Sequence, residues 1–595
     1  MSLDANAEDQ GKPSRPAGSS GANRAWLRAL EMTARLDQAP ERLLASAVEE
    51  WAERQPDAPA LLSDGESLSY GELAARARRY ARWALAQGLA KGEVIALMAP
   101  NSPDYLAFWL GVTSVGAVVA LLNTNLRGPA LVHCLAVARP RHLVLAADFA
   151  DCASAAGEGV RVWAAGEGLG LDELSDAPLS EAERRGTRLG DPALLIYTSG
   201  TTGLPKAARV SHHRVMSWSG WFAGMMDAKP DDRLYDCLPM YHSVGGVVAT
   251  GALLIKGGSV VLREKFSAGR FWDEVVRWDC TLFQYIGELC RYLLAAPPSA
   301  NERAHRLRMI CGNGLRPDVW GPLQDRFAIP KVLEFYAATE GNFSLYNAEG
   351  EPGAIGRIPG FMAQRFPAAI VRHDLATGVP ARGDDGFCQR CAVGEAGEAI
   401  GRIAAGGDPA HRFEGYTDPA ESEKKILKDV FEPGDRWLRT GDMMRVDARG
   451  FWYFVDRIGD TFRWKGENVA TTEVAEALSQ QPGVIEATVY GVAVPGADGK
   501  AGMAALVVGE GFDPATLRRN LAGRLPAYAQ PVFLRLAQSL AVTETFKQKK
   551  AELAREGFDP AMIADPLLVA LPGAEGHVPL DAALYRRITE GEVRL

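Results

Sequence analysis

Short apolar runs alternate with longer segments of helical periodicity after residue 190 of the chain. Each run has the length of a buried strand and is bounded by turn residues. The expected strands are 192–198, 233–239, 259–266, 281–287, 307–314 and 332–339. Strands that alternate with helices favour parallel sheets with helices on both faces, so the pattern predicts an α/β fold.

Two of the helical segments begin with a capping signal. Ser69 precedes the helical run that reaches residue 89, and Glu72 completes a capping box. Ser211 precedes the helical run 211–226. A serine hydroxyl at this position accepts a hydrogen bond from a free backbone N–H of the first turn, so we expect each helix to begin after its serine.

From about residue 457 the pattern changes to a smaller unit. Helical patterns cover 471–484 and 513–525, and strand patterns cover 486–494 and 502–509. A chain of 595 residues is too long for one core. We expect a disordered leader and N-terminal helix over 1–39, a large N-terminal domain with parallel-rich sheets flanked by helices over 40–456, and a small, mobile C-terminal α+β domain over 457–595.

Two segments bear on targeting. Residues 1–23 lack the apolar core of a signal peptide, so we interpret them as a disordered leader. Residues 105–122 contain no charge and reach the lower length limit for a membrane span. A buried helix of an α/β domain fits the same stretch, and we favour that interpretation.

The amino-acid composition of the chain bears on the kind of partner that the protein binds. The formal net charge of −9 argues against nucleic acid as the main partner. A local nest of amides with one lysine can still bind the phosphates of ATP on an acidic protein. The 8 cysteines are scattered, which is typical of a reducing compartment. No second Cys/His pair follows Cys388 and Cys391, so a turn that carries two thiols is favoured over a zinc site.

The stretch YTSGTTGLPK, residues 197–206, follows the expected strand 192–198. Ligands in such sheets bind beyond the carboxyl ends of strands. Gly200 and Gly203 let backbone amides approach an anion, and Lys206 adds a positive charge. The run is no Walker A loop, because proline precedes the lysine. A surface turn is the alternative interpretation, but the whole string favours a loop that holds a triphosphate.

The same stretch is similar to the phosphate-loop signature of the adenylate-forming enzymes, which include acyl-CoA synthetases, firefly luciferase and peptide-synthetase adenylation domains. Further segments resemble motifs of this superfamily in its order: YAATE at 336–340, with Ala337 where glycine is usual, TGD at 440–442, DRIGD at 456–460 and KGENVATTEVAEAL at 465–478. The segments YDCLPMYHS, GDTFRWKGENV and YGVAVPGADGKAGMAA resemble its fatty acid transport protein branch, the long- and very-long-chain acyl-CoA synthetases.

This resemblance, which covers about residues 40–595, implies an ATP-dependent, AMP-forming ligase for a long- or very-long-chain fatty acid. The large domain would bind AMP and form an acyl-adenylate, and the acyl group would then pass to coenzyme A. The implied cofactors are ATP, Mg²⁺ and coenzyme A. Activation is needed because a carboxylate repels nucleophiles, whereas a mixed anhydride with AMP accepts a thiol.

The resemblance also implies roles for individual residues. Catalytic roles fall on Lys547, Thr202, Glu340 and His242, and magnesium ligation falls on Glu340 and Thr201. Oxygen ligands suit this hard ion. Nucleotide- and coenzyme-binding roles fall on Thr198, Ser199, Gly200, Thr201, Thr202, Gly203, Lys206, Gly312, Asn313, Gly314, Tyr336, Thr339, Glu340, Asp442, Phe454, Arg457, Lys465 and Gly466.

Several alternatives stay open at this stage. Lys549 and Lys550 lie close to Lys547 and compete for its role. Gly459 stands where the family hinge usually has Asp or Lys, and its wide φ/ψ range would let the small domain rotate there. A main role in fatty-acid uptake, and a ligase for another bulky acid such as a sterol-derived one, are rival functions. We expect a cytoplasmic protein, attached peripherally to the inner face of a membrane, and a homodimer.

Overall fold

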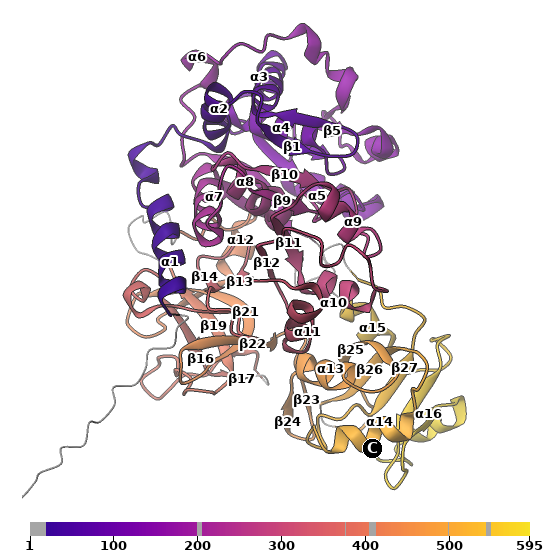
Figure 1. Cartoon of the computed structure of the whole chain (residues 1–595). Helices are drawn as coiled ribbons and strands as arrows, with labels where there is room; N and C mark the ends of the chain where they lie inside the picture. Colours follow the sequence, from indigo (N-terminus) through magenta and orange to yellow (C-terminus); the bar gives the residue numbers. More distant parts are fainter. Residues whose placement is uncertain (1–18, 199–204, 375–376, 404–411, 498, 543–548) are drawn as a thin grey trace, which may run out of the picture.

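A computed structural model describes residues 19–198, 205–374, 377–403, 412–497, 499–542 and 549–595. Two mostly parallel sheets form the upper and central part of the molecule, an antiparallel sheet lies at the lower left, and a smaller C-terminal unit lies at the lower right (Figure 1). The predicted fold class, a large α/β domain followed by a small one, is confirmed. The exact boundary at 456 and 457 stays a prediction.

The sheet of the N-terminal half has the order β6-β5-β3-β4-β7-β8, and only the pair β7–β8 is antiparallel. One face packs on α5 (Gly128–Ala138) and η2 (Ala147–Ala155). Its strands are β3 (Val94–Met98), β4 (Val118–Leu121), β5 (His142–Leu145), β6 (Arg161–Ala164), β7 (Pro192–Thr198) and β8 (Lys206–Ser211). Short helices η3 (Gly166–Leu169), η4 (Leu171–Glu173) and α6 (Glu181–Arg184) lie between β6 and β7 in the chain.

The second sheet has the order β14-β13-β12-β11-β9-β10-β1-β2, with antiparallel strands only at its two edges. Its strands are β1 (Pro59–Leu62), β2 (Ser67–Ser69), β9 (Arg233–Asp236), β10 (Ser259–Leu262), β11 (Leu282–Ile286), β12 (Met309–Asn313), β13 (Val332–Ala337) and β14 (Ser344–Asn347). Each expected strand of the large domain is present, so the alternating pattern predicted this part of the fold correctly.

A layer of helices separates the two sheets and forms the main core with them. It contains α2 (Leu44–Arg54), α3 (Tyr70–Ala86), α4 (Pro103–Ser114), α7 (His212–Met226), the π-helix η5 (Val244–Ala249) and α8 (Thr250–Leu254). The outer face of the second sheet carries α9 (Phe271–Arg277), α10 (Gly287–Ala295) and α11 (Pro317–Phe327). Both capping predictions are confirmed, because Ser69 accepts from Glu72 N and Ser211 accepts from Arg214 N.

The antiparallel sheet was not predicted from the sequence. Its order is β15-β22-β21-β19-β16, with β20 paired to β21. The strands are β15 (Gly356–Arg357), β16 (Ala368–Val371), β19 (Gly397–Arg402), β20 (Ile426–Lys428), β21 (Arg436–Val446) and β22 (Phe451–Arg457). A separate hairpin pairs β17 (His373–Asp374) with β18 (Val379–Pro380), and η6 (Gly360–Met362) and α12 (Pro419–Glu423) are the short helices of this region.

Two expectations for single segments need correction. The leader was expected to reach residue 23, but α1 (Ser19–Thr33) already begins at Ser19. Residues 105–122 are all buried, as expected, yet they are not one helix. The helix α4 ends at Ser114, the chain turns at Gly116 with φ +86°, and β4 follows. Among the helices of the described ranges, none is both long and apolar enough to cross a membrane.

The C-terminal unit has its own apolar core. Its sheet has the order β25-β26-β27-β28-β29, formed by β25 (Val484–Ala493), β26 (Lys500–Val508), β27 (Phe533–Leu536), β28 (Leu567–Ala570) and β29 (His577–Pro579). Its helices are α13 (Thr471–Ser479), α14 (Pro514–Ala522), α15 (Lys550–Glu556) and α16 (Ala582–Thr589). The hairpin of β23 (Phe462–Trp464) and β24 (Glu467–Val469) lies at its left side in Figure 1.

Candidate active site

Tyr336 and Asp442 meet where the eight-stranded sheet approaches the antiparallel sheet. Tyr336 lies near the end of β13, and its hydroxyl donates a hydrogen bond to Asp442 Oδ2 at 2.6 Å. Asp442 lies opposite Arg457 in the β21–β22 register, and Arg457 Nε is 3.7 Å from Asp442 Oδ1. Burial, with Asp442 beside it, raises the pKa of Tyr336, so the phenol stays a donor. Three residues predicted to bind the nucleotide are thus brought together.

A small pocket opens beside this pair. Phe343 forms one side of it and packs on Tyr336 with 5.9 Å between the ring centroids. Phe454 is partly buried against the same apolar cluster, and its predicted role in nucleotide binding stays a prediction. The pocket is lined by Tyr336, Ala338, Glu340, Gly341, Phe343, Leu438, Arg439 and Thr440.

Gly312, Asn313 and Gly314 form the end of β12 and the turn after it. A Cβ at Gly312 would lie 2.2 Å from the Tyr285 carbonyl oxygen, so only glycine fits there. Gly314 takes φ +80°, which is unstrained for glycine. Because β12 and β13 are parallel, this turn lies at the same edge of the sheet as Tyr336, where ligands of such folds bind.

Glu334, which the sequence did not single out, anchors this turn from inside the sheet. Its Oε1 accepts hydrogen bonds from the backbone N–H groups of Gly314 and Leu315, and its Oε2 accepts from the Tyr285 hydroxyl. Burial raises the pKa of Glu334 to about 8. A buried carboxyl group that is held by three donors keeps the turn in one conformation.

Glu340 follows β13 and is held by two side chains of a distant segment. Its Oε1 accepts a hydrogen bond from the Tyr416 hydroxyl at 2.8 Å, and Lys425 Nζ lies 3.9 Å from the same oxygen. No group of three His, Cys, Asp or Glu residues in the described part of the chain could hold a metal ion. Mg²⁺ normally takes one or two carboxylates and completes its shell with phosphates and water, so one glutamate fits magnesium that arrives with ATP.

Thr339, beside Glu340, connects the site to the segment before η5. Thr339 Oγ1 is 3.0 Å from Ser243 Oγ, and the Thr339 carbonyl accepts a hydrogen bond from Arg214 at 2.7 Å. His242 precedes Ser243, and its ring lies 4.6 Å from the Tyr241 ring. The structure therefore places His242 next to the Thr339 contact, and its catalytic role stays a prediction.

The phosphate loop is framed by paired strands. Thr198 at the end of β7 pairs with Lys206 at the start of β8. Lys206 Nζ forms an ion pair with Glu421 and lies 5.8 Å from the centre of the Tyr416 ring. The predicted loop residues Ser199, Gly200, Thr201, Thr202 and Gly203 lie outside the described part of the chain.

Sequence reasoning missed the segment that carries Tyr416, Glu421 and Lys425. This segment pairs with β8, because Arg209 N donates to Gly415 O and Thr417 N donates to Ala207 O. In the sequence it is a polar run, RFEGYTDPAESEKK, whose local signal is Asp-Pro at the start of a short helix. Its place in the site follows from long-range strand pairing, which a local pattern cannot reveal.

The predicted small-domain residues form a second group. Lys465 and Gly466 make the turn between β23 and β24, with φ +51° and +84°. Arg463 Nε donates to Gly466 O at 3.1 Å, and Lys465 Nζ lies over the Trp464 ring at 5.7 Å. These contacts are all within the hairpin, so this arrangement of the domains does not bring Lys465 and Gly466 together with Tyr336.

The segment that carries the predicted catalytic lysine, residues 543–550, is described only from Lys549 onward. Lys547 lies outside the described residues. Lys550 donates to Thr471 Oγ1 at 2.6 Å and lies 3.4 Å from Asp460 Oδ2. Both partners lie at the junction of the two domains, next to Gly459, where a Cβ would meet no heavy atom within 4 Å. Lys550 is therefore engaged at the junction in this arrangement.

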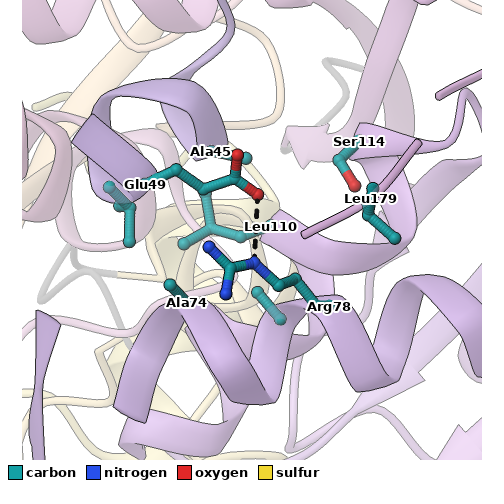
Figure 2. Close-up of a pocket in the computed structure, with 9 residues that line it drawn as sticks. Ala45, Glu49, Ala74, Arg78, Leu110, Ser114 and Leu179 are labelled. Carbon is teal, nitrogen blue, oxygen red and sulfur yellow. Dashed lines mark hydrogen bonds and ion pairs between the residues drawn. The ribbon is translucent and has the colours of Figure 1, made fainter. Parts of the chain in front are cut away.

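A second pocket lies far from these residues, between α2, α3 and α4. Figure 2 shows Glu49 of α2 facing Arg78 of α3, with Leu110 and Leu179 nearby. Glu49 Oε1 lies 3.5 Å from Arg78 Nε, and Glu49 Oε2 accepts from Arg184 at 2.6 Å. Since these charges pair within the chain and no predicted site residue lines the pocket, we assign it to helix packing.

The arrangement of these groups is that of a nucleotide site at the carboxyl edge of a parallel sheet, completed by Asp442 of the antiparallel sheet. Residues 48–379 match the family of the AMP-binding enzyme, and residues 473–547 match that of the AMP-binding enzyme C-terminal domain. The chain therefore belongs to the AMP-binding enzyme family, and the predicted resemblance is confirmed.

Its relatives include long-chain fatty acid transport protein 1 of Mus musculus, 40% identical over 565 residues, which are 91% of this chain and 87% of the relative. The medium/long-chain-fatty-acid–CoA ligase FadD6 of Mycobacterium tuberculosis is 41% identical over 552 residues, 91% of this chain and 90% of the relative. Among solved structures, ATP-bound MatB from Rhodopseudomonas palustris has a TM-score of 0.73 at 26% identity, covering 86% of this chain and 98% of that one.

Proposed function

We propose that this chain is an ATP-dependent, AMP-forming ligase that joins a long-chain fatty acid to coenzyme A. The observation that carries the proposal is the convergence of Tyr336, Asp442 and Glu340 at one edge of the sheet. A phenol, a ribose-binding carboxylate and a carboxylate for magnesium are the groups that adenylation needs. The names of the two relatives indicate the acyl substrate, because both refer to long-chain fatty acids.

The reaction would proceed in two steps. A carboxylate oxygen of the acid attacks the α-phosphate of ATP, the bond to the β-phosphate breaks, and pyrophosphate leaves. The thiolate of coenzyme A then attacks the acyl carbon, and AMP leaves with the bonding electron pair. Asp442 would accept hydrogen bonds from the ribose hydroxyls, and Lys206 and the phosphate loop would hold the leaving pyrophosphate. Magnesium at Glu340 would neutralise charge on the phosphates.

Turnover of acids with graded chain length tests this function. With ATP, Mg²⁺ and coenzyme A, we expect one AMP and one acyl-CoA per acid consumed, with the highest kcat/KM for long chains. ADP as the product would overturn the proposal. A preference for a sterol-derived acid would retain the chemistry and change the substrate class. Fatty-acid uptake should also be measured in cells that carry a variant without ligase activity. Loss of uptake would indicate that cells retain the acid by converting it to acyl-CoA, and unchanged uptake would indicate transport without catalysis.

We also propose a cytoplasmic location with peripheral attachment to the inner face of a membrane, and a homodimer. The acyl substrate partitions into bilayers, which supports attachment at the membrane surface. High salt or carbonate should therefore release the protein from membranes. If only detergent releases it, the peripheral assignment is wrong. Sedimentation at several concentrations tests the dimer.

A further inference from the structure

Tyr416 stands between three groups that the proposed function requires. Its hydroxyl donates to Glu340 Oε1 at 2.8 Å and lies near the Thr198 side chain. Lys206 Nζ lies 5.8 Å from the centre of its ring. Thr198 and Lys206 flank the phosphate loop, so one side chain contacts the expected magnesium ligand and lies near both ends of that loop.

The backbone around Tyr416 is fixed. Residues 415–417 lie beside β8 like an additional strand, with Tyr416 directly opposite Ala208. Tyr416 N donates to Ser422 Oγ at 2.8 Å. The residue is only 4% exposed, so its ring has no freedom to turn away. A hydroxyl that is held in this way can fix the orientation of the carboxylate that it contacts.

A single glutamate is a weak magnesium ligand unless its rotamer is fixed. The Tyr416 hydrogen bond occupies Glu340 Oε1 and leaves Oε2 as the oxygen that can turn to the metal. Supporting hydrogen bonds of this kind orient metal ligands in other sites. Lys425 Nζ lies 3.9 Å from the same Oε1 and donates to Thr440 O at 3.4 Å, so it balances the charge of Glu340 without replacing the tyrosine.

We infer that Tyr416 is a positioning residue for magnesium–ATP: it orients Glu340 and ties this carboxylate to the strand pair that carries the phosphate loop. The inference rests on the proposed function, because it assumes that Glu340 binds magnesium during adenylation. It concerns only the first half-reaction. Binding of AMP, which needs no magnesium, and thioester formation from supplied acyl-adenylate do not depend on it.

The variant Tyr416→Phe tests the inference because it removes the hydroxyl and keeps the ring. We expect the Mg²⁺ concentration at half-maximal ATP binding, measured by calorimetry, to rise about tenfold or more, since a hydrogen bond to a charged group is lost. AMP affinity and thioester formation from acyl-adenylate should stay within about twofold of the parent. Tyr235→Phe is the matched control, because its hydroxyl donates to Glu274 at 2.6 Å away from the site.

A double-mutant cycle shows whether Tyr416 acts through Glu340. In a Glu340→Gln background, Tyr416→Phe should add less than about a twofold change to the Mg²⁺ dependence. Full additivity would overturn the inference, as would an unchanged Mg²⁺ midpoint in the single variant. Equal loss of AMP binding would also overturn it, because the tyrosine would then support the whole site. If the parent does not adenylate an acid at all, the proposed function itself fails.

Discussion

At the scale of single residues, the carboxylate of Asp442 lies between a phenol and a guanidinium. Tyr336 donates to one of its oxygens at 2.6 Å, and Arg457 lies 3.7 Å from the other. Burial and this carboxylate raise the pKa of the Tyr336 hydroxyl, so the hydroxyl keeps its proton and donates it in the hydrogen bond to Asp442. These two neighbours therefore hold the Asp442 carboxylate in one orientation beside the pocket.

The variant Asp442→Asn should lower the affinity for AMP by about tenfold or more. The amide keeps the shape of the side chain but loses the charge that strengthens two hydrogen bonds to ribose, which contribute roughly 1.5–3 kcal/mol each. Calorimetric titration with AMP measures the effect. Asp447→Asn, in the turn between β21 and β22, is the control, since Asp447 bonds its own turn and Tyr453 of the adjoining strand. A similar loss in the control would show that the effect is not local to the ribose site.

At the scale of one element, the first residue of α7 makes helix stability depend on pH. His212 is buried, its Nε2 lies 3.2 Å from the Thr113 carbonyl, and burial lowers its pKa to about 4. The folded protein therefore keeps this ring neutral, whereas the unfolded chain binds a proton below about pH 6.5. Between these two values the unfolded state holds more protons, so stability falls as pH falls.

The free energy of opening α7 should decrease by about 3 kcal/mol between about pH 7 and about pH 4, since one pKa unit corresponds to about 1.4 kcal/mol. Hydrogen exchange of the α7 amides, measured by mass spectrometry over this range, gives the value for the element itself. The variant His212→Gln keeps a polar side chain without a titrating ring and should flatten the dependence. Equal slopes in parent and variant would show that other groups control the acid sensitivity.

Elements with local signals could be predicted from the sequence, and elements that depend on distant partners could not. The caps at Ser69 and Ser211 need only the next turn of the helix. The antiparallel sheet pairs segments that lie far apart in the chain, such as β15 with β22, so a local pattern did not reveal it. Tyr416 and Lys425 were missed for the same reason: pairing of 415–417 with β8 places them in the site.

At the scale of the whole molecule, side chains of the large domain, Arg291 and Arg316 among them, contact the small domain. Arg291 of α10 bonds Glu486 of the small domain at 2.8 Å, and Arg316 lies 3.4 Å from Ser479 Oγ. In this arrangement the polar and cation–π contacts of the Lys465–Gly466 turn with described residues lie within its own hairpin. The resemblance implies a nucleotide- or coenzyme-binding role for this turn, so we expect the thioester step to need another arrangement of the domains.

The variant Arg291→Ala should loosen the observed arrangement. The pair is partly buried, so we expect a loss of roughly 1 kcal/mol and about fivefold faster hydrogen exchange at residues 457–462. Arg326→Ala is the matched control, because Arg326 bonds Glu302 at 3.0 Å within the large domain. Unchanged exchange at the junction in Arg291→Ala would show that other contacts hold the domains.

Substitution of one lysine should affect the two half-reactions differently. Lys547 would meet the charge that develops between carboxylate and α-phosphate, and loss of such a group costs about 3 kcal/mol, roughly a hundredfold or more in rate. Lys547→Ala should therefore block acyl-adenylate formation from acid and ATP, yet still convert supplied acyl-adenylate and coenzyme A to the thioester. We expect this because a rotation about Gly459 would replace the lysine with the Lys465–Gly466 turn. Pyrophosphate release and thioester formation, assayed separately, give the two rates.

Lys549→Ala is the neighbouring control and should leave both rates intact. Equal loss of both rates in folded Lys547→Ala protein would exclude the two-arrangement scheme, and loss of neither would move the catalytic role to Lys549 or Lys550.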